Sequence, residues 1–228
     1  MGNVAGYCLL RTYYARAEAV ALFPSNSSYY RKQNALLPAK SGRRIVLFGD
    51  SRVARWGSFP RVEGFEVVNR GMDGETTAQM RTRFQEDVLA LDPDFVVLEM
   101  GINDLVGIAV LPQRREEIVF QCAENMRHFV DELSSRKIRA ILLTVIPPAP
   151  PPFWRLPVWS RDIAVEAGRL NRYWIDLSAT PMLRVIDTES ALMDSTGRWR
   201  ENVNADTLHL TLQGYQYLNA AILQVLRE

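Results

Sequence analysis

The chain has little cysteine and little histidine. Its 228 residues include two cysteines, Cys8 and Cys122, which lie far apart, and two histidines, His128 and His209. This scarcity excludes a disulfide framework and the paired-cysteine or clustered-histidine patterns that are typical of zinc sites. No glycine-rich phosphate-binding loop follows an apolar run either. We therefore expect no metal, nucleotide or other cofactor.

An excess of charge of either sign is also absent. Lysine and arginine number 27 and aspartate and glutamate 26, for a formal net charge of +1. Nucleic-acid binding depends on a basic surface that neutralises phosphates, so this balance argues against nucleic acid as a partner. Hydrophobic residues make up 47% of the sequence, which is typical of a globular protein with a core of its own.

Long apolar runs are missing as well. The longest, near 95–98 and 140–148, are too short for a transmembrane helix. Residues 1–23 contain Arg11, Arg16 and Glu18 and so lack the uninterrupted core of a secretory signal. We interpret residues 1–42 as an N-terminal extension, either a lead-in helix or the remnant of an anchor. A lead-in helix slightly favours a cytoplasmic location, and the remnant of an anchor favours an envelope or periplasmic location. The sequence leaves the oligomeric state open.

From residue 43 onward, short apolar runs alternate with helical patterns. The runs predict strands near 44–49, 65–69, 94–100, 138–145 and 183–186. Helices are predicted at 76–91, from Pro112 through Leu133, at 162–177 and from Thr211, as the N-cap, to Leu226. Strands joined by helical crossovers favour a parallel sheet covered on both faces. We expect one α/β domain over residues 43–228, a three-layer α/β/α sandwich with the flavodoxin-like strand order 2-1-3-4-5.

Several polar residues and glycines are predicted to lie where these strands end. Open parallel sheets bind ligands at the carboxyl ends of their strands. In chain order, the residues at these ends and before the last helix are Ser51, Gly71, Asn103, Asp206 and His209. Taken singly, each has an ordinary structural interpretation as a helix cap, a turn residue or half of a surface ion pair.

Together these residues supply the parts of acyl transfer. A serine hydroxyl becomes a good nucleophile when a base takes its proton, and histidine is suited to that role near neutral pH. His128 lies off the apolar stripe of its predicted helix and is expected to face water, which leaves His209 as the general base for Ser51. Asp206 lies three residues before His209, close enough to accept the Nδ1 proton and orient the ring.

An oxyanion hole can be assembled from the same strand ends. The backbone amides of Ser51 and Gly71 and the side-chain amide of Asn103 are the donors we expect to face a developing oxyanion. Glycine suits this role because, without Cβ, it lets a substrate oxygen approach the main chain.

Four blocks of the sequence, in this order, resemble those of the SGNH, or GDSL, hydrolases: Gly49-Asp50-Ser51, Gly71 within residues 69–76, Gly101-Ile102-Asn103-Asp104 and Asp206-Thr207-Leu208-His209. The resemblance covers roughly residue 43 to the C-terminus. It implies an α/β/α fold and a metal-free serine esterase or lipase-type hydrolase. It also implies Ser51 as nucleophile, His209 as base, Asp206 as its partner, and oxyanion donors from Ser51, Gly71 and Asn103.

Four residues outside the triad are candidates for substrate binding. Arg52 departs from the family pattern, in which small or polar residues often follow the serine. It either lies at the mouth of the site, which it narrows or where it binds an anionic substrate group, or is a solvated surface residue. Phe153, Trp154 and Trp159 follow the fourth strand and either wall an acyl or sugar pocket or cover the sheet. We expect a small acyl ester as substrate, acetyl or short acyl, with O-acetyl carbohydrate as one example.

Other functions remain as alternatives. A lysophospholipase- or thioesterase-like enzyme and an acyltransferase would use the same triad, and a catalytically silent binding module would share the fold. A glycosidase built on two of Asp50, Asp73 and Asp104 is a further alternative. We favour the interpretation in which these aspartates brace turns.

Overall fold

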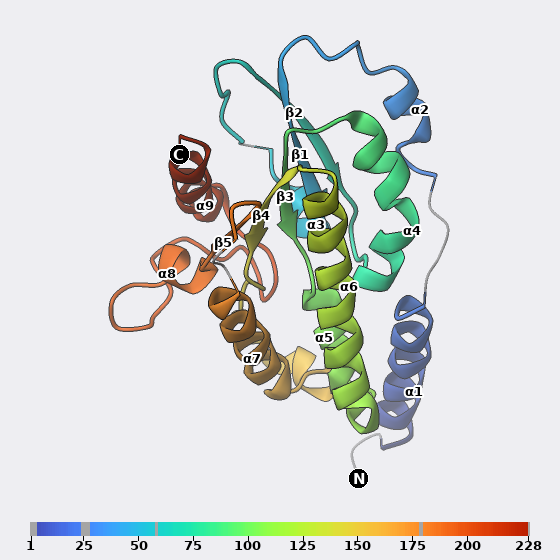
Figure 1. Ribbon diagram of the computed structural model, residues 1–228. Helices are drawn as coiled ribbons and strands as arrows, with labels where there is room; N and C mark the ends of the chain where they lie inside the picture. The colour runs from blue at the N-terminus through green and yellow to red at the C-terminus, as the bar shows by residue number, and fades with distance from the viewer. Residues whose placement is uncertain (1–3, 24–27, 58, 178–179, 228) are drawn as a thin grey trace.

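The computed structural model describes residues 4–23, 28–57, 59–177 and 180–227 and contains a five-stranded parallel sheet between helices (Figure 1). Its strands pair in the order β2-β1-β3-β4-β5, which confirms the predicted three-layer fold and strand order. The strands are β1 (Arg43–Gly49), β2 (Phe65–Gly71), β3 (Phe95–Glu99), β4 (Arg139–Leu143) and β5 (Leu183–Ile186). In register, Gly49 pairs with both Gly71 and Glu99, so the central strands end level with one another.

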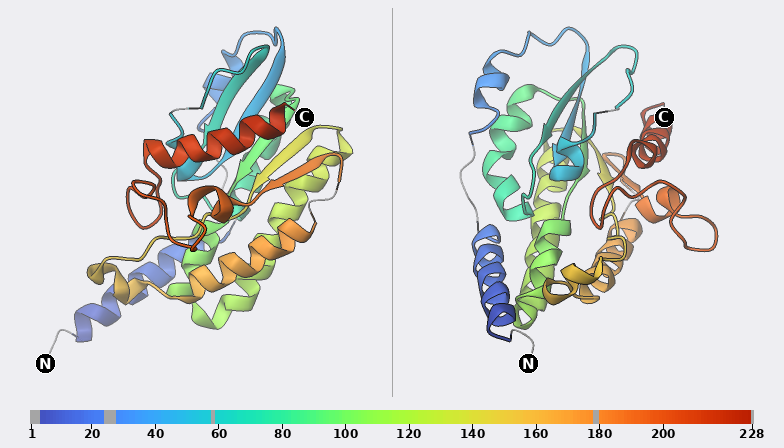
Figure 2. Two further views of the ribbon diagram at one scale, coloured as in Figure 1. Left: turned by 90° about the vertical axis from the view of Figure 1, so that its left-hand side faces the viewer. Right: turned by 180° about the vertical axis from the view of Figure 1, so that it is seen from behind.

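Side chains alternate along the strands between two cores. Val46 and Phe48 of β1 face one core, and Ile45 and Leu47 face the other. The first core is covered by α4 (Thr77–Asp87), α6 (Arg115–Ser135) and α7 (Asp162–Asp176), and the second by α8 (Thr188–Leu192) and α9 (Leu212–Leu226). Figure 2 shows α9 on the side of the sheet across from α4 and α6. Burial on both faces explains why the strands read as apolar runs.

The helices follow their sequence signals, with small differences at their ends. The apolar stripe of α6, which consists of Ile118, Cys122, Met126, Phe129 and Leu133, is buried. Thr211 caps α9 by accepting a hydrogen bond from the Gly214 amide. The predicted helix 76–91 ends earlier, at Asp87, and continues as a 3₁₀ turn, Leu89–Leu91. Pro112 opens a 3₁₀ turn, and α6 itself begins three residues later. Such shifts arise because short 3₁₀ turns are common at helix termini.

The N-terminal extension contains helices α1 (Val4–Ala21) and α2 (Arg31–Ala35); its residues 1–3 and 24–27 lie outside the described residues. One face of α1, with Ala15 and Ala19, packs against the first core. The role of residues 1–42 as a separate extension stays a prediction. Among the helices described, none combines the length and apolarity that crossing a membrane would need.

Candidate active site

Ser51 is the first residue of the short helix α3 (Ser51–Ala54), directly beyond the carboxyl end of β1. A Cβ at Gly49 would lie 2.1 Å from the Glu99 carbonyl oxygen, so only glycine allows β1 to pack this closely on β3. The buried Asp50 carboxylate accepts a hydrogen bond of 2.9 Å from the Arg52 amide and thereby caps α3. This sharp turn presents the Ser51 hydroxyl at the edge of the sheet.

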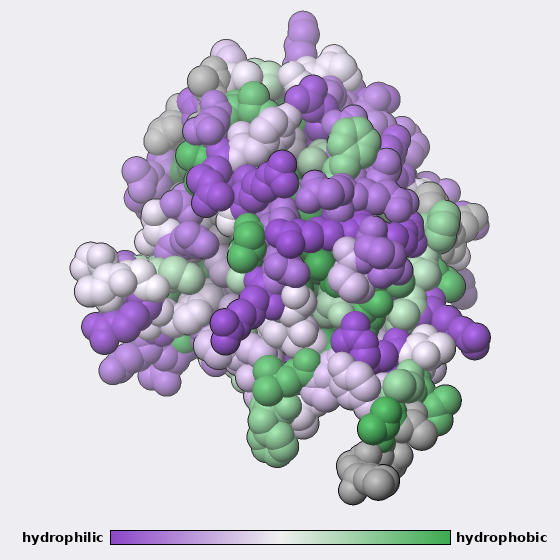
Figure 3. All heavy atoms as spheres, turned by 90° about the horizontal axis from the view of Figure 1, so that it is seen from below, coloured by the Kyte–Doolittle hydropathy of each residue, from purple (hydrophilic) through white to green (hydrophobic). Residues whose placement is uncertain are grey.

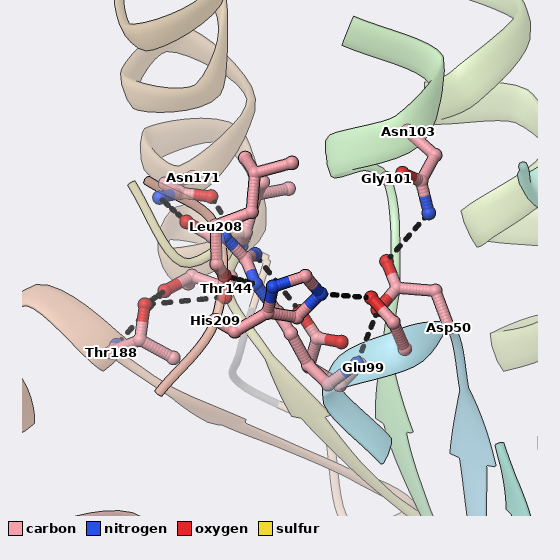
Figure 4. Close-up of polar contacts among 12 residues, drawn as sticks. Asp50, Glu99, Gly101, Asn103, Thr144, Asn171, Thr188, Leu208 and His209 are labelled. Carbon is pink, nitrogen blue, oxygen red and sulfur yellow. Dashed lines mark hydrogen bonds and ion pairs between the residues drawn. The ribbon is translucent and has the colours of Figure 1, made fainter. Parts of the chain in front are cut away.

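A tight loop before α9 brings His209 to Ser51. The loop closes through hydrogen bonds from the Ala205 amide to the His209 carbonyl, 2.9 Å, and from the Thr211 amide to the Val203 carbonyl, 2.8 Å. The His209 ring then lies with Nε2 3.0 Å from Ser51 Oγ. Figure 4 shows the ring pointing across the edge of the sheet toward this hydroxyl. The predicted contact between two residues 158 positions apart is thus present.

Asp206 holds the other side of the imidazole. Its Oδ2 lies 2.7 Å from His209 Nδ1, while Oδ1 accepts hydrogen bonds from the amides of Leu208 and His209. Partial burial raises the pKa of the Asp206 carboxyl, but these hydrogen bonds outweigh it and lower the pKa to about 2. Asp206 is therefore ionised at neutral pH and can stabilise a positive charge on the ring.

Asn103 lies on the opposite side of Ser51, in α5 (Ile102–Val106). Its side-chain amide donates to the Asp50 carboxylate at 3.3 Å and to the Glu75 carbonyl at 2.9 Å. Figure 4 shows the amide directed toward Asp50. The contact to Asp50 is the longer and therefore the weaker of the two. The N–H group that makes it can donate to a substrate oxygen instead.

The next residue, Asp104, fixes this helix to α4. Its carboxylate accepts hydrogen bonds from the Thr77 amide, 2.9 Å, and the Thr77 hydroxyl, 2.5 Å. Burial raises the pKa of Asp104 to about 6, although both hydrogen bonds oppose the increase. Asp50 and Asp104 thus brace turns, as the sequence interpretation held, and Asp73 pairs with Arg55 at the surface.

The structure contradicts the predicted role of Gly71 as an oxyanion donor. Its amide already donates to Asn69 Oδ1 at 2.8 Å, and a Cβ at this position would lie 2.0 Å from the Ala54 nitrogen. Gly71 is therefore a packing residue that lets β2 approach α3. The second glycine of the same block, Gly74, is exposed and has a φ of +76°. Its amide donates no hydrogen bond within the described residues, and it precedes the carbonyl that Asn103 binds.

A substitution at Gly71 tests this packing role. Gly71→Ala is expected to lower the free energy of unfolding by about 3 kcal/mol or more, because the new methyl overlaps backbone atoms that cannot move aside. Urea unfolding measures the loss. Gly57→Ala is the control, since a Cβ at Gly57 meets nothing within 4 Å. Equal stability of the two variants would contradict the packing role.

Arg52 lies neither at the mouth of the site nor on the surface, so both sequence interpretations of it are wrong. The residue is 1% exposed. Its Nε donates to the Leu208 carbonyl at 2.7 Å, and its Nη1 pairs with Glu99 Oε1 at 3.2 Å. Arg52 therefore ties the end of β3 to the loop that carries His209. The sequence did contain a signal for this ion pair. Glu99 ends an otherwise apolar strand, and a buried acid at that position needs a basic partner such as Arg52.

Asp50 and Glu99 form a carboxyl pair beneath Ser51. Burial raises the pKa of Asp50 well above its usual range, and the Glu99 charge raises it further. Glu99 Oε2 has no hydrogen-bond partner among the described residues, while its Oε1 pairs with the Arg52 guanidinium at 3.2 Å. The region behind the nucleophile is thus a buried cluster of two acids and one arginine.

The aromatic residues after β4 differ in their burial. Trp159 is half-buried against the first core, with the Arg155 guanidinium 4.9 Å from its ring centre. Phe153 and Trp154 are 78% and 69% exposed, and Trp154 lines a hollow shared with α1. The Ala149 amide donates to the Thr207 carbonyl at 2.9 Å and so joins the segment after β4 to the loop before α9. The role of these rings as the wall of an acyl pocket stays a prediction.

The remaining histidine lies elsewhere. His128 is half-buried on α6, and burial lowers its pKa. In the ranges that the structure describes, no three histidine, cysteine, aspartate or glutamate side chains gather in a way that could hold a metal ion.

A parallel sheet with serine, histidine and aspartate in line at its carboxyl edge is an arrangement typical of serine hydrolases. The sequence profile of the GDSL-like lipase/acylhydrolase family matches residues 47–217. The chain belongs to this family, which confirms the resemblance.

Two curated proteins and one solved structure illustrate the relationship. An uncharacterized lipoprotein, YqeF, of Bacillus subtilis is 31% identical over 120 residues, 45% of this chain and 48% of that protein. An acetylxylan esterase of Geobacillus stearothermophilus is 40% identical over 57 residues, 25% and 26% of the two chains. The chain thus matches half or less of each curated relative's length. A GDSL-like lipase of Bacteroides thetaiotaomicron shares the fold, with a TM-score of 0.69, 24% identity and coverage of 87% and 95%.

Proposed function

We propose that this chain is a serine esterase that cleaves small acyl esters through an acyl-enzyme on Ser51. The observation that carries the proposal is the continuous line of contacts from Ser51 Oγ to His209 Nε2, 3.0 Å, and from His209 Nδ1 to Asp206, 2.7 Å. His209 accepts the hydroxyl proton as Oγ attacks the ester carbonyl, and then returns it to the departing alkoxide. Water, activated by the same imidazole, hydrolyses the acyl-enzyme.

Three donors surround the position of the developing oxyanion. They are the Ser51 amide at the start of α3, the Asn103 side-chain amide and the Gly74 amide, which takes the place first given to Gly71. Gly74 is supported by its left-handed backbone, its exposed position and its connection through Glu75 to Asn103. Donors fixed in advance by the fold stabilise the transition state without reorganising as it forms.

The acyl group in this proposal is acetyl or another short acyl group, and acetylated carbohydrate is the favoured class of substrate. The similarity to an acetylxylan esterase supports this choice.

A panel of p-nitrophenyl esters from acetate to decanoate, assayed with and without a chelator, tests the function. We expect the acetate to give the highest kcat/KM, and the chelator to have no effect. Release of acetate from acetylated xylooligosaccharides then tests the carbohydrate class. A maximum at long chains would favour the lipase-like alternative, and failure to hydrolyse any ester would favour the silent binding module.

Asn103→Ala is expected to lower kcat by about 10²–10³-fold with little change in KM, because the amide acts on the transition state rather than on bound ester. Steady-state kinetics on the best ester of the panel measure both constants. Asn34→Ala is the control, since Asn34 is also a bonded amide but binds Glu86 and Asp87 on α4. An effect confined to KM would show that Asn103 only positions the substrate.

A further inference from the structure

Helix α1 and the 3₁₀ segment η4 (Phe153–Val158) form an exposed apolar surface at one end of the molecule. Figure 3 views this end from below and shows hydrophobic side chains projecting among hydrophilic neighbours. We call this surface the α1/η4 patch and define it by Leu9, Tyr13, Val20, Phe153, Trp154 and Leu156, which are all more than half exposed.

Helix α1 carries apolar residues on opposite faces. Ala15 and Ala19 pack on the first core, whereas Leu9, Tyr13 and Val20, on the far side of the helix, are 72%, 69% and 72% exposed. Apolar side chains that gather on an exposed face are typical of a surface that contacts a partner or a membrane.

The helix and η4 present this surface together. The guanidinium of Arg11 donates to the Pro157 carbonyl and to the Ala109 carbonyl, both at 2.8 Å, and so fixes α1 to the loops at the carboxyl edge of the sheet. Between the two segments lies a hollow of about 380 Å³. Its apolar walls include Leu10, Tyr14 and Trp154. The hollow therefore lies beside the patch, and Trp154 belongs to both.

The charge around the patch is positive, although the whole chain is nearly neutral. Segments 4–21 and 153–161 contain one acid, Glu18, and four arginines, namely Arg11, Arg16, Arg155 and Arg161. Burial raises the pKa of Glu18, and the nearby Asp104 charge adds to this; even with Glu18 ionised, the four arginines leave these segments with a positive net charge. Arg16 lies on the same outer face of α1 as Leu9 and Tyr13, by helical spacing.

We propose that the α1/η4 patch binds the surface of an anionic lipid bilayer, with α1 lying in the plane of the interface. Tyrosine and tryptophan are the side chains that collect at the level of lipid headgroups, where one end of the ring is wet and the other apolar. Apolar residues beside arginines are typical of helices that lie on membranes, and acidic headgroups supply the matching charge. Because the Ala149 amide bonds to the Thr207 carbonyl, this orientation places the His209 loop at the lipid side of the molecule.

Co-sedimentation of the full chain with vesicles tests the proposal, and it needs no enzymatic activity. We expect binding to equal parts of phosphatidylcholine and phosphatidylglycerol, weak binding to phosphatidylcholine alone, and weakening by salt. The double variant Leu9→Ser/Tyr13→Ser, and separately Trp154→Ser, should lower partitioning about tenfold. Arg16→Gln should lower it about fivefold on the anionic vesicles only.

Leu36→Ser is the matched control, since Leu36 is 83% exposed but follows α2, away from the patch (Figure 1). It should bind vesicles as the unchanged protein does. The proposal is overturned if the unchanged protein ignores anionic vesicles, if it binds neutral ones equally, or if the patch variants bind undiminished. It is also overturned if sedimentation velocity shows a dimer that the patch variants dissociate, because a second copy would then cover the surface.

Discussion

Ser51→Ala is expected to lower kcat on p-nitrophenyl acetate by about 10⁴-fold or more while leaving the fold intact. The methyl group cannot attack the ester, and the remaining oxyanion donors by themselves support only a small residual rate. Removing the hydroxyl costs one hydrogen bond, to His209, so the free energy of unfolding should change by about 1 kcal/mol or less. Steady-state assays and urea unfolding measure the two effects.

Covalent labelling adds an independent test of Ser51. A fluorophosphonate should modify the unchanged protein once, at Ser51 by peptide mass spectrometry, and should leave Ser51→Ala unmodified. Ser135→Ala, at the end of α6, is the control and should be labelled normally. Activity of Ser51→Ala within threefold of the unchanged protein would remove Ser51 from the mechanism.

Arg52→Gln is expected to lower kcat about a hundredfold with little change in KM. The change removes the hydrogen bond to the Leu208 carbonyl, so the adjacent His209 ring loses its fixed position over Ser51, and misplacement of a catalytic group by about 1 Å costs about this much. It also leaves Glu99 buried without its guanidinium, which should lower the free energy of unfolding by about 3–5 kcal/mol.

The double variant Arg52→Met/Glu99→Leu separates positioning from stability. Replacing a buried ion pair by apolar side chains is often neutral for stability, so unfolding should return to within about 1 kcal/mol of the unchanged protein. The lost contact to Leu208 is not restored, so kcat should stay about a hundredfold low. Recovery of kcat together with stability would show that Arg52 acts only through the fold.

Arg44 offers a matched control for this pair. It is equally a buried arginine, bonded to the Leu91 carbonyl and paired with Glu66 at 2.8 Å, but it lies at the opposite end of β1 from Ser51. Arg44→Met/Glu66→Leu should therefore leave kcat and KM unchanged. A similar loss of kcat in this variant would mean that kcat falls whenever an ion pair of the sheet is removed, and that Arg52 has no specific positioning role.

Much of the site could be predicted because its parts act locally. Asp206 and His209 lie three residues apart, and a carboxylate at that spacing accepts hydrogen bonds from the Leu208 and His209 amides and also contacts the ring, all in a single turn. Ser51 was found because a buried strand ends in glycine and a capping aspartate. The errors fell on residues whose roles depend on how they are packed. Gly71 is excluded as a donor by a side chain and a helix packed around it, and Arg52 is drawn inward by Leu208, 156 residues away.

The sequence by itself determined the order of strands and helices, because apolar periodicity reports which faces must be buried, and it determined which residues end the strands. Parallel strands bring those ends to one edge, so the meeting of Ser51 and His209 followed from topology. Only the tertiary structure decided which donors remain free and which charges are buried. Those properties depend on packing between segments that are distant in the sequence, and burial can change the role of a side chain, as it does for Arg52.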